Sequence, residues 1–221
     1  MRSSSFLRFW EMNKNLSDKV INRLTLYHSI LTDYIEKNIE YISSPQIADL
    51  LHVDNTQVRK DIALLNYKGK CKVGYKAKEL KLLIEETLKF KTVKTAFIVG
   101  AGNLGMALAK YDNFEAYGFN ISALFDNSPL KIGLKVNDRE VFHLNELPNI
   151  AEKDDAKIAI LTVPRQFAQE VTDFLVESGI KYIWNFTPCV LNVPNDVQVW
   201  NENLIGNFLQ FTVNHNVDEK N

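Results

Sequence analysis

The glycine-rich run Gly100-Ala101-Gly102-Asn103-Leu104-Gly105 has the residue types and spacing that most directly indicate ligand chemistry in this sequence. A strand-like run, 95–99, precedes it, and a helix is expected over 106–111. In a G-x-G-x-x-G turn the first glycine permits the tight turn, the second lets the backbone approach a pyrophosphate, and the third lets the helix pack on the strand. Because the motif alone is weak, it needs support from a second feature.

Asp126 supplies that second feature. It follows the expected second strand, 120–125, and lies 21 residues after Gly105. A carboxylate at this distance accepts hydrogen bonds from the ribose hydroxyls of NAD(H) and repels the 2′-phosphate of NADP(H). The two features together predict a dinucleotide site that prefers NAD(H).

Two further turns are expected at the carboxyl ends of strands, where parallel α/β sheets place their ligands. Thr162-Val163-Pro164 closes the expected strand 156–163, and Asn185-Phe186 closes the expected strand 182–186. Both turns are candidates to line the nucleotide site. The alternative, in which the prolines in these turns only punctuate loops, stays open from the sequence alone.

A helix-turn-helix is predicted in the first half of the chain. Ser44 is expected to cap a short helix over 45–51, and Asp54 is expected to cap a second helix over 55–66. The second helix of this motif enters the major groove of DNA with its N-terminal residues toward the bases. The exposed residues at that end are candidate DNA contacts: Asn55, Thr56, Gln57, Arg59 and Lys60.

Residues 67–75 predict a small β-hairpin wing, since two glycines supply turns and lysines alternate between them. Lys68, Lys70 and Lys72 would lie on one face of a strand, with Lys70 and Lys72 as phosphate contacts. Cys71 lies between these two lysines, and an inert surface thiol is preferred over a thiol that senses oxidants. A winged helix that binds protein instead of DNA is the alternative for this half.

Charge is unevenly distributed along the chain. Residues 1–92 carry 16 Lys and Arg against 11 Asp and Glu, a net charge of +5, whereas the rest carries 10 against 16, a net charge of −6. A basic N-terminal half favours a polyanionic partner such as DNA.

The composition fits an ordinary globular protein of one or two domains, with 46% hydrophobic and 24% charged residues among 221. Apolar runs such as 158–163 are far shorter than the roughly 20 residues that a membrane span requires. The two cysteines and four scattered histidines build neither a disulfide framework nor a metal site. The expected compartment is therefore the reducing cytoplasm.

The residues needed for enzymatic chemistry are not arranged for it in the sequence. Neither a Ser-His-Asp set nor an H-E-x-x-H or G-K-[ST] motif is recognised, and His143 suits the cap of a helix better than catalysis. The acidic pairs Glu85-Glu86 and Asp154-Asp155 are interpreted as solvated surface. We expect a protein that is not an enzyme. A small NAD-dependent oxidoreductase and a CoA-binding-type Rossmann regulator are the alternatives.

The expected fold class is α/β: a winged-helix domain over 17–92, a Rossmann-type parallel-sheet domain over 93–200, and a C-terminal helix over 201–215. Disordered tails are expected at 1–16 and 216–221. The first domain begins with a long amphipathic helix after Ser17, and helices over 144–151 and 164–178 alternate with the strands of the second domain. The boundary between the two domains is placed where a helical pattern gives way to a strand-like one.

The C-terminal helix is apolar nearly all round, so it needs burial on several sides. Dimerisation or domain swapping is the preferred interpretation, and a helix that packs against its own sheet is the alternative. Its apolar residues are Leu204, Ile205, Phe208, Leu209, Phe211 and Val213.

The order of these parts resembles the Rex family of redox-sensing transcriptional repressors from about residue 20 to residue 213. The matching segments are Val20-Ile21-Asn22-Arg23-Leu24, Ile42-Ser43-Ser44, Gln57-Val58-Arg59-Lys60-Asp61, Val73-Gly74-Tyr75, Gly100-Ala101-Gly102-Asn103-Leu104-Gly105, Ala159-Ile160-Leu161-Thr162-Val163-Pro164, Ala168-Gln169-Glu170-Val171, and Asn185-Phe186-Thr187-Pro188 with Leu191-Asn192-Val193-Pro194.

The resemblance implies a homodimer with swapped C-terminal helices that binds an inverted-repeat operator, is released by NADH, and controls genes of fermentation and respiration. It implies that Arg59 and Lys60 contact DNA. The residues implied to lie at the adenosine and pyrophosphate are Gly100, Gly102, Asn103, Leu104, Gly105 and Asp126. Those implied to lie toward the nicotinamide are Tyr111, Thr162, Val163, Pro164, Asn185 and Phe186.

The chain also departs from this family. The family's Tyr-Phe-Gly after the recognition helix is Leu64-Leu65-Asn66 here, and its Thr-Arg-Gly in the wing is Lys70-Cys71-Lys72, so the resemblance does not carry over the operator sequence. Many members have Asp-Phe where this chain has Asn203-Leu204, and an arginine where it has Ser29. Leu204 then takes the place of the phenylalanine that covers the partner's nicotinamide. Our hypothesis is that the switch works through other contacts or responds less to NADH.

Overall fold

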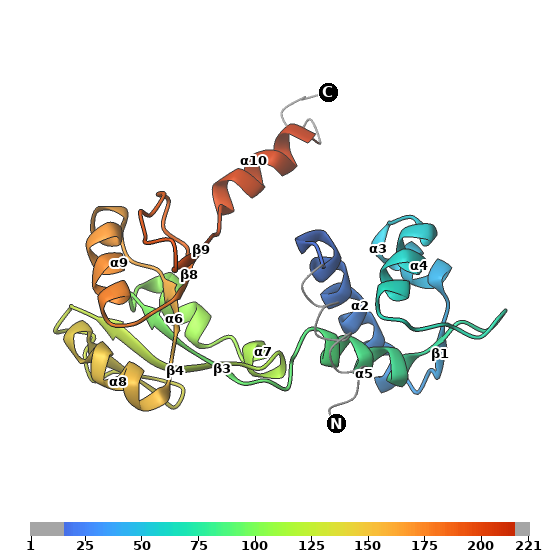
Figure 1. Ribbon diagram of the computed structural model, residues 1–221, viewed down its shortest axis with the longest axis horizontal. Helices are drawn as coiled ribbons and strands as arrows, with labels where there is room; N and C mark the ends of the chain where they lie inside the picture. Colours follow the sequence, from blue (N-terminus) through green and yellow to red (C-terminus); the bar gives the residue numbers. More distant parts are fainter. Residues whose placement is uncertain (1–15, 215–221) are drawn as a thin grey trace. The chain divides into compact units, whose positions relative to one another are not determined.

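Three groups of buried apolar side chains divide between two units of the chain, which meet between Lys91 and Thr92. The computed structural model describes residues 16–214 (Figure 1). The expected tails therefore lie outside the described residues, apart from Leu16, and so does His215 at the end of the expected terminal helix.

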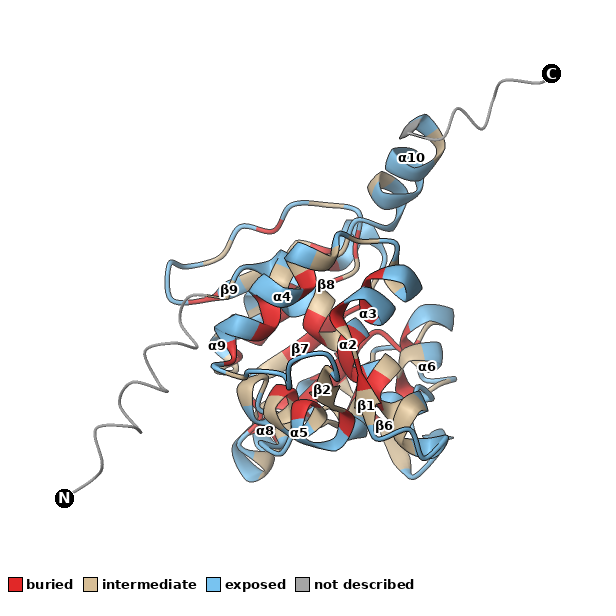
Figure 2. Cartoon of the chain, turned by 90° about the vertical axis from the view of Figure 1, so that its right-hand side faces the viewer, coloured by how far each residue is buried: buried red, intermediate tan, exposed pale blue. Residues whose placement is uncertain are grey.

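The first unit is a small helical domain with a two-stranded sheet. Leu24, Tyr27 and Leu31 of its first helix are completely buried, and they recur at helical spacing against the remaining helices. Figure 2 shows buried residues along α2 and α4. The elements in chain order are α2 (Asp18–Glu36), β1 (Tyr41–Ile42), α3 (Ser44–Leu51), α4 (Asn55–Leu64), β2 (Tyr75–Lys76) and α5 (Ala77–Thr87).

The helix-turn-helix consists of α3 and α4, joined by residues 52–54. Asp54 caps α4 as predicted, since its carboxylate accepts a hydrogen bond from the Thr56 N–H at 2.6 Å. The prediction for α3 was wrong by one residue, because Ser43 and not Ser44 is its N-cap. Ser43 and Gln46 exchange side-chain and backbone hydrogen bonds in a capping box, which leaves Ser44 as the first, buried residue of the helix.

The expected β-hairpin over 67–75 is instead a tight turn. Lys70 and Gly74 form a single antiparallel bridge, and Lys72 has a φ of 60° inside the turn. The prediction that Lys68, Lys70 and Lys72 share one face of a strand was therefore wrong. The returning chain pairs with β1, and a Cβ atom at Gly74 would come within 2.4 Å of the Ile42 carbonyl oxygen. The strand that follows Gly74, β2, therefore pairs with β1.

The second unit has one seven-stranded sheet in the order β5-β6-β4-β3-β7-β8-β9, in which only β5 is antiparallel to its neighbour. Its elements are β3 (Lys94–Val99), α6 (Asn103–Ala109), α7 (Asn113–Ala116), β4 (Phe119–Asp126), β5 (Lys135–Val136), β6 (Arg139–His143), η2 (Leu144–Glu146), α8 (Leu147–Asp154), β7 (Ile158–Leu161), η3 (Arg165–Phe167), α9 (Ala168–Glu177), β8 (Tyr182–Asn185), β9 (Gln198–Asn201) and α10 (Leu204–Asn214).

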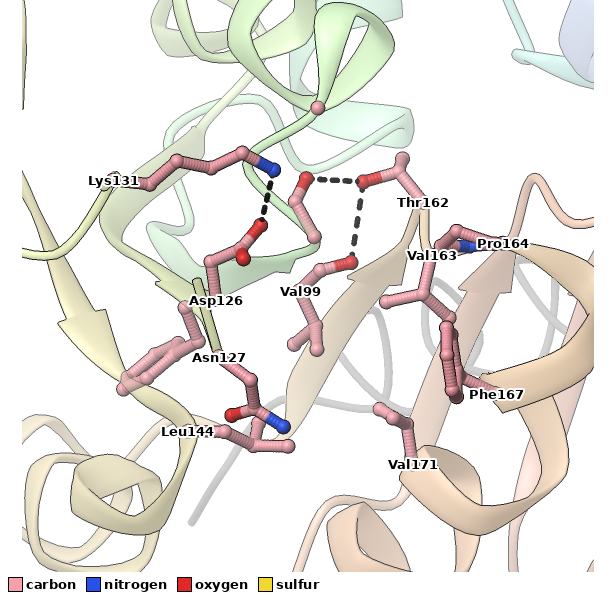
Figure 3. Close-up of a pocket in the computed structure, with 13 residues that line it drawn as sticks. Val99, Asp126, Asn127, Lys131, Leu144, Thr162, Val163, Pro164, Phe167 and Val171 are labelled. Atoms are coloured by element: carbon pink, nitrogen blue, oxygen red, sulfur yellow. Dashed lines mark hydrogen bonds and ion pairs between the residues drawn. The ribbon is translucent and has the colours of Figure 1, made fainter. Parts of the chain in front are cut away.

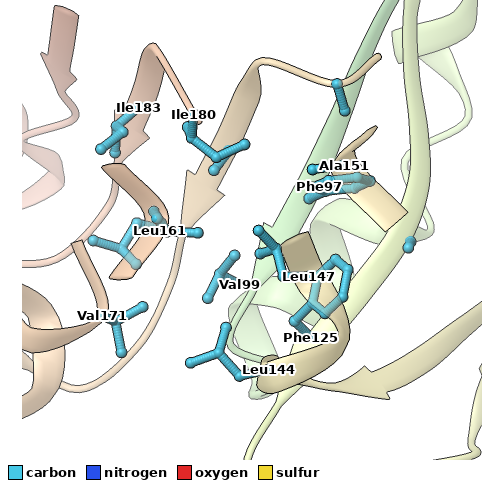
Figure 4. Close-up of a cluster of buried hydrophobic side chains, with 14 of the residues drawn as sticks. Phe97, Val99, Phe125, Leu144, Leu147, Ala151, Leu161, Val171, Ile180 and Ile183 are labelled. Carbon is cyan, nitrogen blue, oxygen red and sulfur yellow. The ribbon is translucent and has the colours of Figure 1, made fainter. Parts of the chain in front are cut away.

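The strand order of this sheet is that of a dinucleotide-binding Rossmann fold, with the direction of winding reversing between β3 and β7. Residues alternate between its two faces, as the pleat requires. Phe97 and Val99 of β3 join the core under α8 and α9 (Figure 4), whereas Ala96 and Ile98 join the core under α6. The expected α/β fold class with a parallel sheet is confirmed.

Several element boundaries differ from those expected. The helix after the glycine-rich run begins at Asn103 instead of 106 and ends at Ala109, so Tyr111 lies outside it. The helices expected at 144 and 164 each begin with a 3₁₀ turn. Strand β9 was not predicted, because its four residues, Gln198–Asn201, are too few to show a periodic pattern and three of them are exposed at the edge of the sheet. In residues 16–214, no helix is long and apolar enough to cross a membrane.

Candidate functional site

A cavity of about 560 Å³ opens at the carboxyl ends of β3, β4 and β7, where the winding of the sheet reverses. This is the position at which open α/β sheets bind their ligands. Figure 3 shows Asp126 and Leu144 on one side of the cavity and Val163, Phe167 and Val171 on the other. Its lining residues are Val99, Gly100, Gly102, Phe125, Asp126, Asn127, Lys131, Leu144, Thr162, Val163, Pro164, Phe167 and Val171.

The glycine-rich turn is held by both neighbouring strands. Gly100 has a φ of 105° and donates its N–H to the carbonyl oxygen of Phe125 in β4 at 2.8 Å. The Thr162 hydroxyl donates to the carbonyl oxygens of Gly100 at 2.7 Å and of Val99 at 3.1 Å (Figure 3). Thr162 therefore positions the turn from the end of β7.

Gly102 and Gly105 differ in what an added side chain would meet. A Cβ atom on Gly105 would lie 2.0 Å from the Gly100 carbonyl oxygen, so only glycine lets α6 pack this closely on the turn. A Cβ atom on Gly102 would have no atom within 4 Å. The protein itself thus leaves open the space beside Gly102, at the wall of the cavity where a pyrophosphate would approach the backbone.

Asp126 stands at the end of β4 with both carboxylate oxygens engaged. Its Oδ2 accepts hydrogen bonds from the Ala101 N–H at 2.8 Å and from Lys131 Nζ at 2.9 Å, and its Oδ1 accepts from the Ser128 N–H at 2.8 Å. Burial alone raises the pKa of this carboxyl, but the hydrogen bonds from Lys131 and the two backbone amides outweigh it and hold the pKa below the ordinary value. The group is therefore ionised at neutral pH.

The structure brings together six of the predicted nucleotide residues in the lining of this one cavity: Gly100, Gly102, Asp126, Thr162, Val163 and Pro164. Ala101, Asn103, Leu104 and Gly105 belong to the same turn and the start of α6. The remaining predicted residues, Tyr111, Asn185, Phe186 and Leu204, do not line it.

Asn185 is buried, and its amide group is engaged within the protein. Its nitrogen donates to the Cys189 carbonyl oxygen and to Asn201 Oδ1, and its oxygen accepts from the N–H and the hydroxyl of Thr187. These contacts hold the turn after β8 against β9. Any contact of this turn with a ligand is therefore expected from neighbouring groups rather than from the Asn185 amide.

Lys131 and Phe167 are lining residues that the sequence reasoning missed. Lys131 lies in an irregular loop five residues after Asp126, and its closeness in the sequence to a carboxylate predicted to bind ribose was the available signal. Phe167 follows the turn at Pro164 and ends η3. It was not predicted because it falls inside the expected helix over 164–178, where an apolar residue is expected to join the core.

Apart from Gln57, the predicted DNA-contacting residues separate into two groups. Arg59, Lys70 and Lys72 line a groove of about 410 Å³ between the N-terminus of α3 and the turn over 67–75. The Arg59 Nε donates to the Ser44 hydroxyl at 3.0 Å, which directs its guanidinium toward α3. Asn55, Thr56 and Lys60 lie outside this groove on α4, where Thr56 and Lys60 are exposed.

Gln57 has a different environment from the other predicted contacts. Its side chain donates to Asp61 Oδ1 at 2.8 Å, and Asp61 is only 1% exposed. Arg23 donates to both oxygens of the same carboxylate, at 2.6 and 2.8 Å, and Tyr27 donates at 2.7 Å. This network ties α4 to α2, so Gln57 serves the orientation of α4 in this structure.

His143 caps η2, as its position after a strand suggested: its Nδ1 accepts a hydrogen bond from the Asn145 N–H at 3.2 Å.

Across residues 16–214, no three histidine, cysteine, aspartate or glutamate side chains are grouped to hold a metal ion.

Comparison with known proteins covers both units. Residues 15–63 match a family model described as "Putative DNA-binding protein N-terminus", and residues 91–189 match one described as "CoA binding domain". The chain is 38% identical over 194 residues to the "Redox-sensing transcriptional repressor Rex" of Clostridium botulinum (strain Alaska E43 / Type E3), which covers 88% of this chain and 92% of that protein. For the protein of the same name from strain Hall, identity is 37% over 202 residues, covering 91% and 96%.

Solved structures agree with these relatives. The crystal structure of RSP in complex with β-NAD⁺ and operator DNA has a TM-score of 0.83 and 34% identity, covering 92% of this chain and 94% of that one. RSP in complex with β-NADH has a TM-score of 0.80 and 35% identity, covering 92% and 95%. A third structure of RSP is described as that of a Rex-family repressor.

Proposed function

This chain belongs to the Rex family of redox-sensing transcriptional repressors, and we propose that it binds operator DNA and is released from it by NADH. The observation that carries the proposal is the cavity at the switch point of the sheet, where Asp126 and the glycine-rich turn form one wall. It lies in the same chain as a helix-turn-helix. The named relatives are transcriptional repressors, which is a role without catalysis.

The residues of the cavity fit NAD(H). The turn around Gly102 leaves space for a pyrophosphate, and the ionised Asp126 offers acceptors for ribose hydroxyls. The bound dinucleotide supplies the redox state that is sensed, and no proton or hydride transfer is asked of the protein. We place the protein in the cytoplasm, where operator DNA and the NAD(H) pool meet.

For DNA binding, we assign different roles to the two groups of basic and polar residues. Arg59, held by Ser44, together with Lys70 and Lys72 forms a basic groove suited to a phosphate backbone. Asn55, Thr56 and Lys60 at the start of α4 are the candidates for base edges. An inverted repeat then requires two copies of the chain.

Dimerisation is assigned to α10, whose apolar side chains are 53–72% exposed within this chain. We expect Phe208→Glu to convert the dimer to a monomer, because burial of a phenylalanine contributes about 1.5–3 kcal/mol and a buried unpaired charge costs more. Light scattering coupled to size-exclusion chromatography measures the change. Gln210→Glu adds the same charge to the same helix and is expected to leave the dimer intact. A Phe208→Glu dimer as tight as the wild type would contradict the assignment.

The preference for NAD(H) over NADP(H) is assigned to Asp126. Replacing it with serine removes the carboxylate that repels a 2′-phosphate and leaves the Lys131 ammonium group beside the ribose position. This ammonium group then attracts the 2′-phosphate. We expect the ratio of NADPH to NADH affinity to rise about tenfold or more, a change of ~1.4 kcal/mol or above. Asp196→Ser is the matched control, since Asp196 pairs with Lys181 on the surface of the same unit. An unchanged ratio would contradict the role of Asp126.

Nucleotide binding is tested directly by titration of the full chain with NADH, NAD⁺, NADPH and CoA. Trp184 and Trp200 lie in the nucleotide-binding unit, so their fluorescence reports NADH by energy transfer. We expect NADH to bind more tightly than NADPH and to resist competition by CoA. CoA that displaces NADH at equal concentration would instead support the regulator that senses CoA.

By the resemblance to the family, Ser29 and Asn203 correspond to the positions at which many members have the ion pair of the redox switch. Asn203 has a structural role, because its Oδ1 accepts a hydrogen bond from the Gly206 N–H at 2.8 Å at the start of α10. We propose that the NADH response of this chain depends on contacts other than that ion pair.

A further inference from the structure

One wall of the nucleotide cavity carries an aromatic side chain, that of Phe167. Phe167 ends η3 and lies one helical turn before Val171 of α9, so the two side chains face the same side, and both line the cavity (Figure 3). Leu144 faces them from the other side of the cavity. Apolar surfaces on two opposite sides make this end of the cavity a slot.

Phe167 differs from its apolar neighbours in how far it is exposed. Its side chain is 47% exposed, whereas Val171 and Leu144 are 7% exposed. Phe125, the other aromatic lining residue, is fully buried and packs edge to face against Phe97 at 5.0 Å between ring centroids. Phe167 is thus the aromatic side chain of this cavity that has surface left to cover a ligand.

The position of Asp126 in the cavity determines which part of a dinucleotide can reach the slot. Asp126 marks the ribose of the adenosine half, and the base on that ribose must lie within one sugar of the carboxylate. The nicotinamide is separated from that ribose by two phosphates and a second sugar. The planar group that can occupy the slot beside Asp126 is therefore the adenine.

We propose that Phe167 stacks on the adenine ring of the dinucleotide and holds this end of the ligand in the slot; the inference rests on the NAD(H) site proposed above. Stacking of a base on an aromatic side chain prefers an offset parallel arrangement of the two rings and depends on the area that they share. A purine is favoured over a pyrimidine by the larger overlap. The position of Phe167 directly after the Pro164 turn keeps its ring at the cavity wall.

The test is calorimetric titration of the full chain with two probes, NADH and ADP-ribose. ADP-ribose has the adenine half of the dinucleotide and lacks the nicotinamide. We expect Phe167→Ala to weaken both by the same factor, about tenfold to a hundredfold, the range typical of base stacking. Phe167→Trp should restore affinity, and Tyr182→Ala, which removes an exposed aromatic ring from β8, should not change it.

Two results would overturn the inference while leaving the NAD(H) site in place. In one, NADH and ADP-ribose bind Phe167→Ala as tightly as they bind the wild type. In the other, NADH weakens and ADP-ribose does not, which would place the ring against the nicotinamide half. Wild-type protein that binds neither probe would overturn the proposed nucleotide site itself. The melting temperature of each variant is measured alongside, and a loss restored by tryptophan at an unchanged melting temperature supports stacking over a structural role.

Discussion

Replacing Asp61 with alanine is expected to lower the free energy of unfolding of the N-terminal unit by about 3–5 kcal/mol. Asp61 is buried, and its carboxylate receives hydrogen bonds from Arg23, Tyr27 and Gln57. Without it, the partly buried Arg23 guanidinium keeps its charge and loses both hydrogen bonds. The cost of the variant is mainly that of leaving this charge unpaired.

The effect of Asp61 also has a pH dependence of known sign. Burial raises the pKa of this carboxyl, but the hydrogen bonds from Arg23, Tyr27 and Gln57 outweigh burial and leave the pKa below its ordinary value. A lowered folded-state pKa contributes stability above the unfolded-state pKa, and this stability is lost as the pH falls through the folded-state pKa. The stability difference between wild type and Asp61→Ala should therefore shrink in acid.

Urea unfolding followed by circular dichroism measures this loss, and hydrogen exchange of peptides from α2 and α4 assigns it to the first unit. Asp49→Ala, at an exposed position of α3, is the control and should change stability by less than about 0.5 kcal/mol. A loss below about 1 kcal/mol in Asp61→Ala would show that the network does not hold α4 against α2. Because α4 supplies the candidate base contacts, operator affinity should fall with stability.

The second large effect is expected from alanine at Gly102, where the fold tolerates a side chain and the ligand does not. Gly102 has extended backbone, and its Cβ atom would meet no protein atom within 4 Å. The variant should unfold like the wild type, but the methyl group occupies the space needed by the pyrophosphate. We expect NADH affinity to fall about a hundredfold or more, which is ~3 kcal/mol.

Gly105→Ala is the matched variant, in which the added methyl group meets the protein itself and not the ligand. Its Cβ atom collides with the backbone carbonyl of Gly100, so α6 must move and the free energy of unfolding should fall by about 1–3 kcal/mol. Calorimetric titration and thermal unfolding of both variants separate the two effects. NADH binding to Gly102→Ala with wild-type affinity would show that the pyrophosphate does not approach this turn.

The parts of the fold that the sequence predicted well are those with short-range signals. The start of α4 could be predicted from Asp54, because a capping side chain acts on backbone groups only two or three residues away. The turn over 100–105 could be predicted because its glycine spacing directly follows the apolar run of β3 in the sequence. Asp126 could be placed because the βαβ unit has a typical length. These features depend on little beyond their neighbours in the sequence.

The parts that sequence reasoning missed depend on contacts between distant residues. The wing could not be distinguished from a β-hairpin, because its strand partner is β1, more than 30 residues earlier. Gln57 has the sequence position of a base contact, and only the buried carboxylate of Asp61 shows its other role. Lys131 and Phe167 join the cavity through an irregular loop and a 3₁₀ turn, which carry no periodic pattern.

The most direct test of the proposed function is the fluorescence anisotropy of a labelled DNA fragment that contains an AT-rich inverted repeat from the organism's own fermentation promoters. The fragment is saturated with the full chain at one fixed salt concentration and titrated separately with NADH and NAD⁺. The structure and the family predict that NADH releases the DNA and that NAD⁺ does not. Specific binding that neither nucleotide changes would contradict the redox-sensing role and leave only a DNA-binding protein.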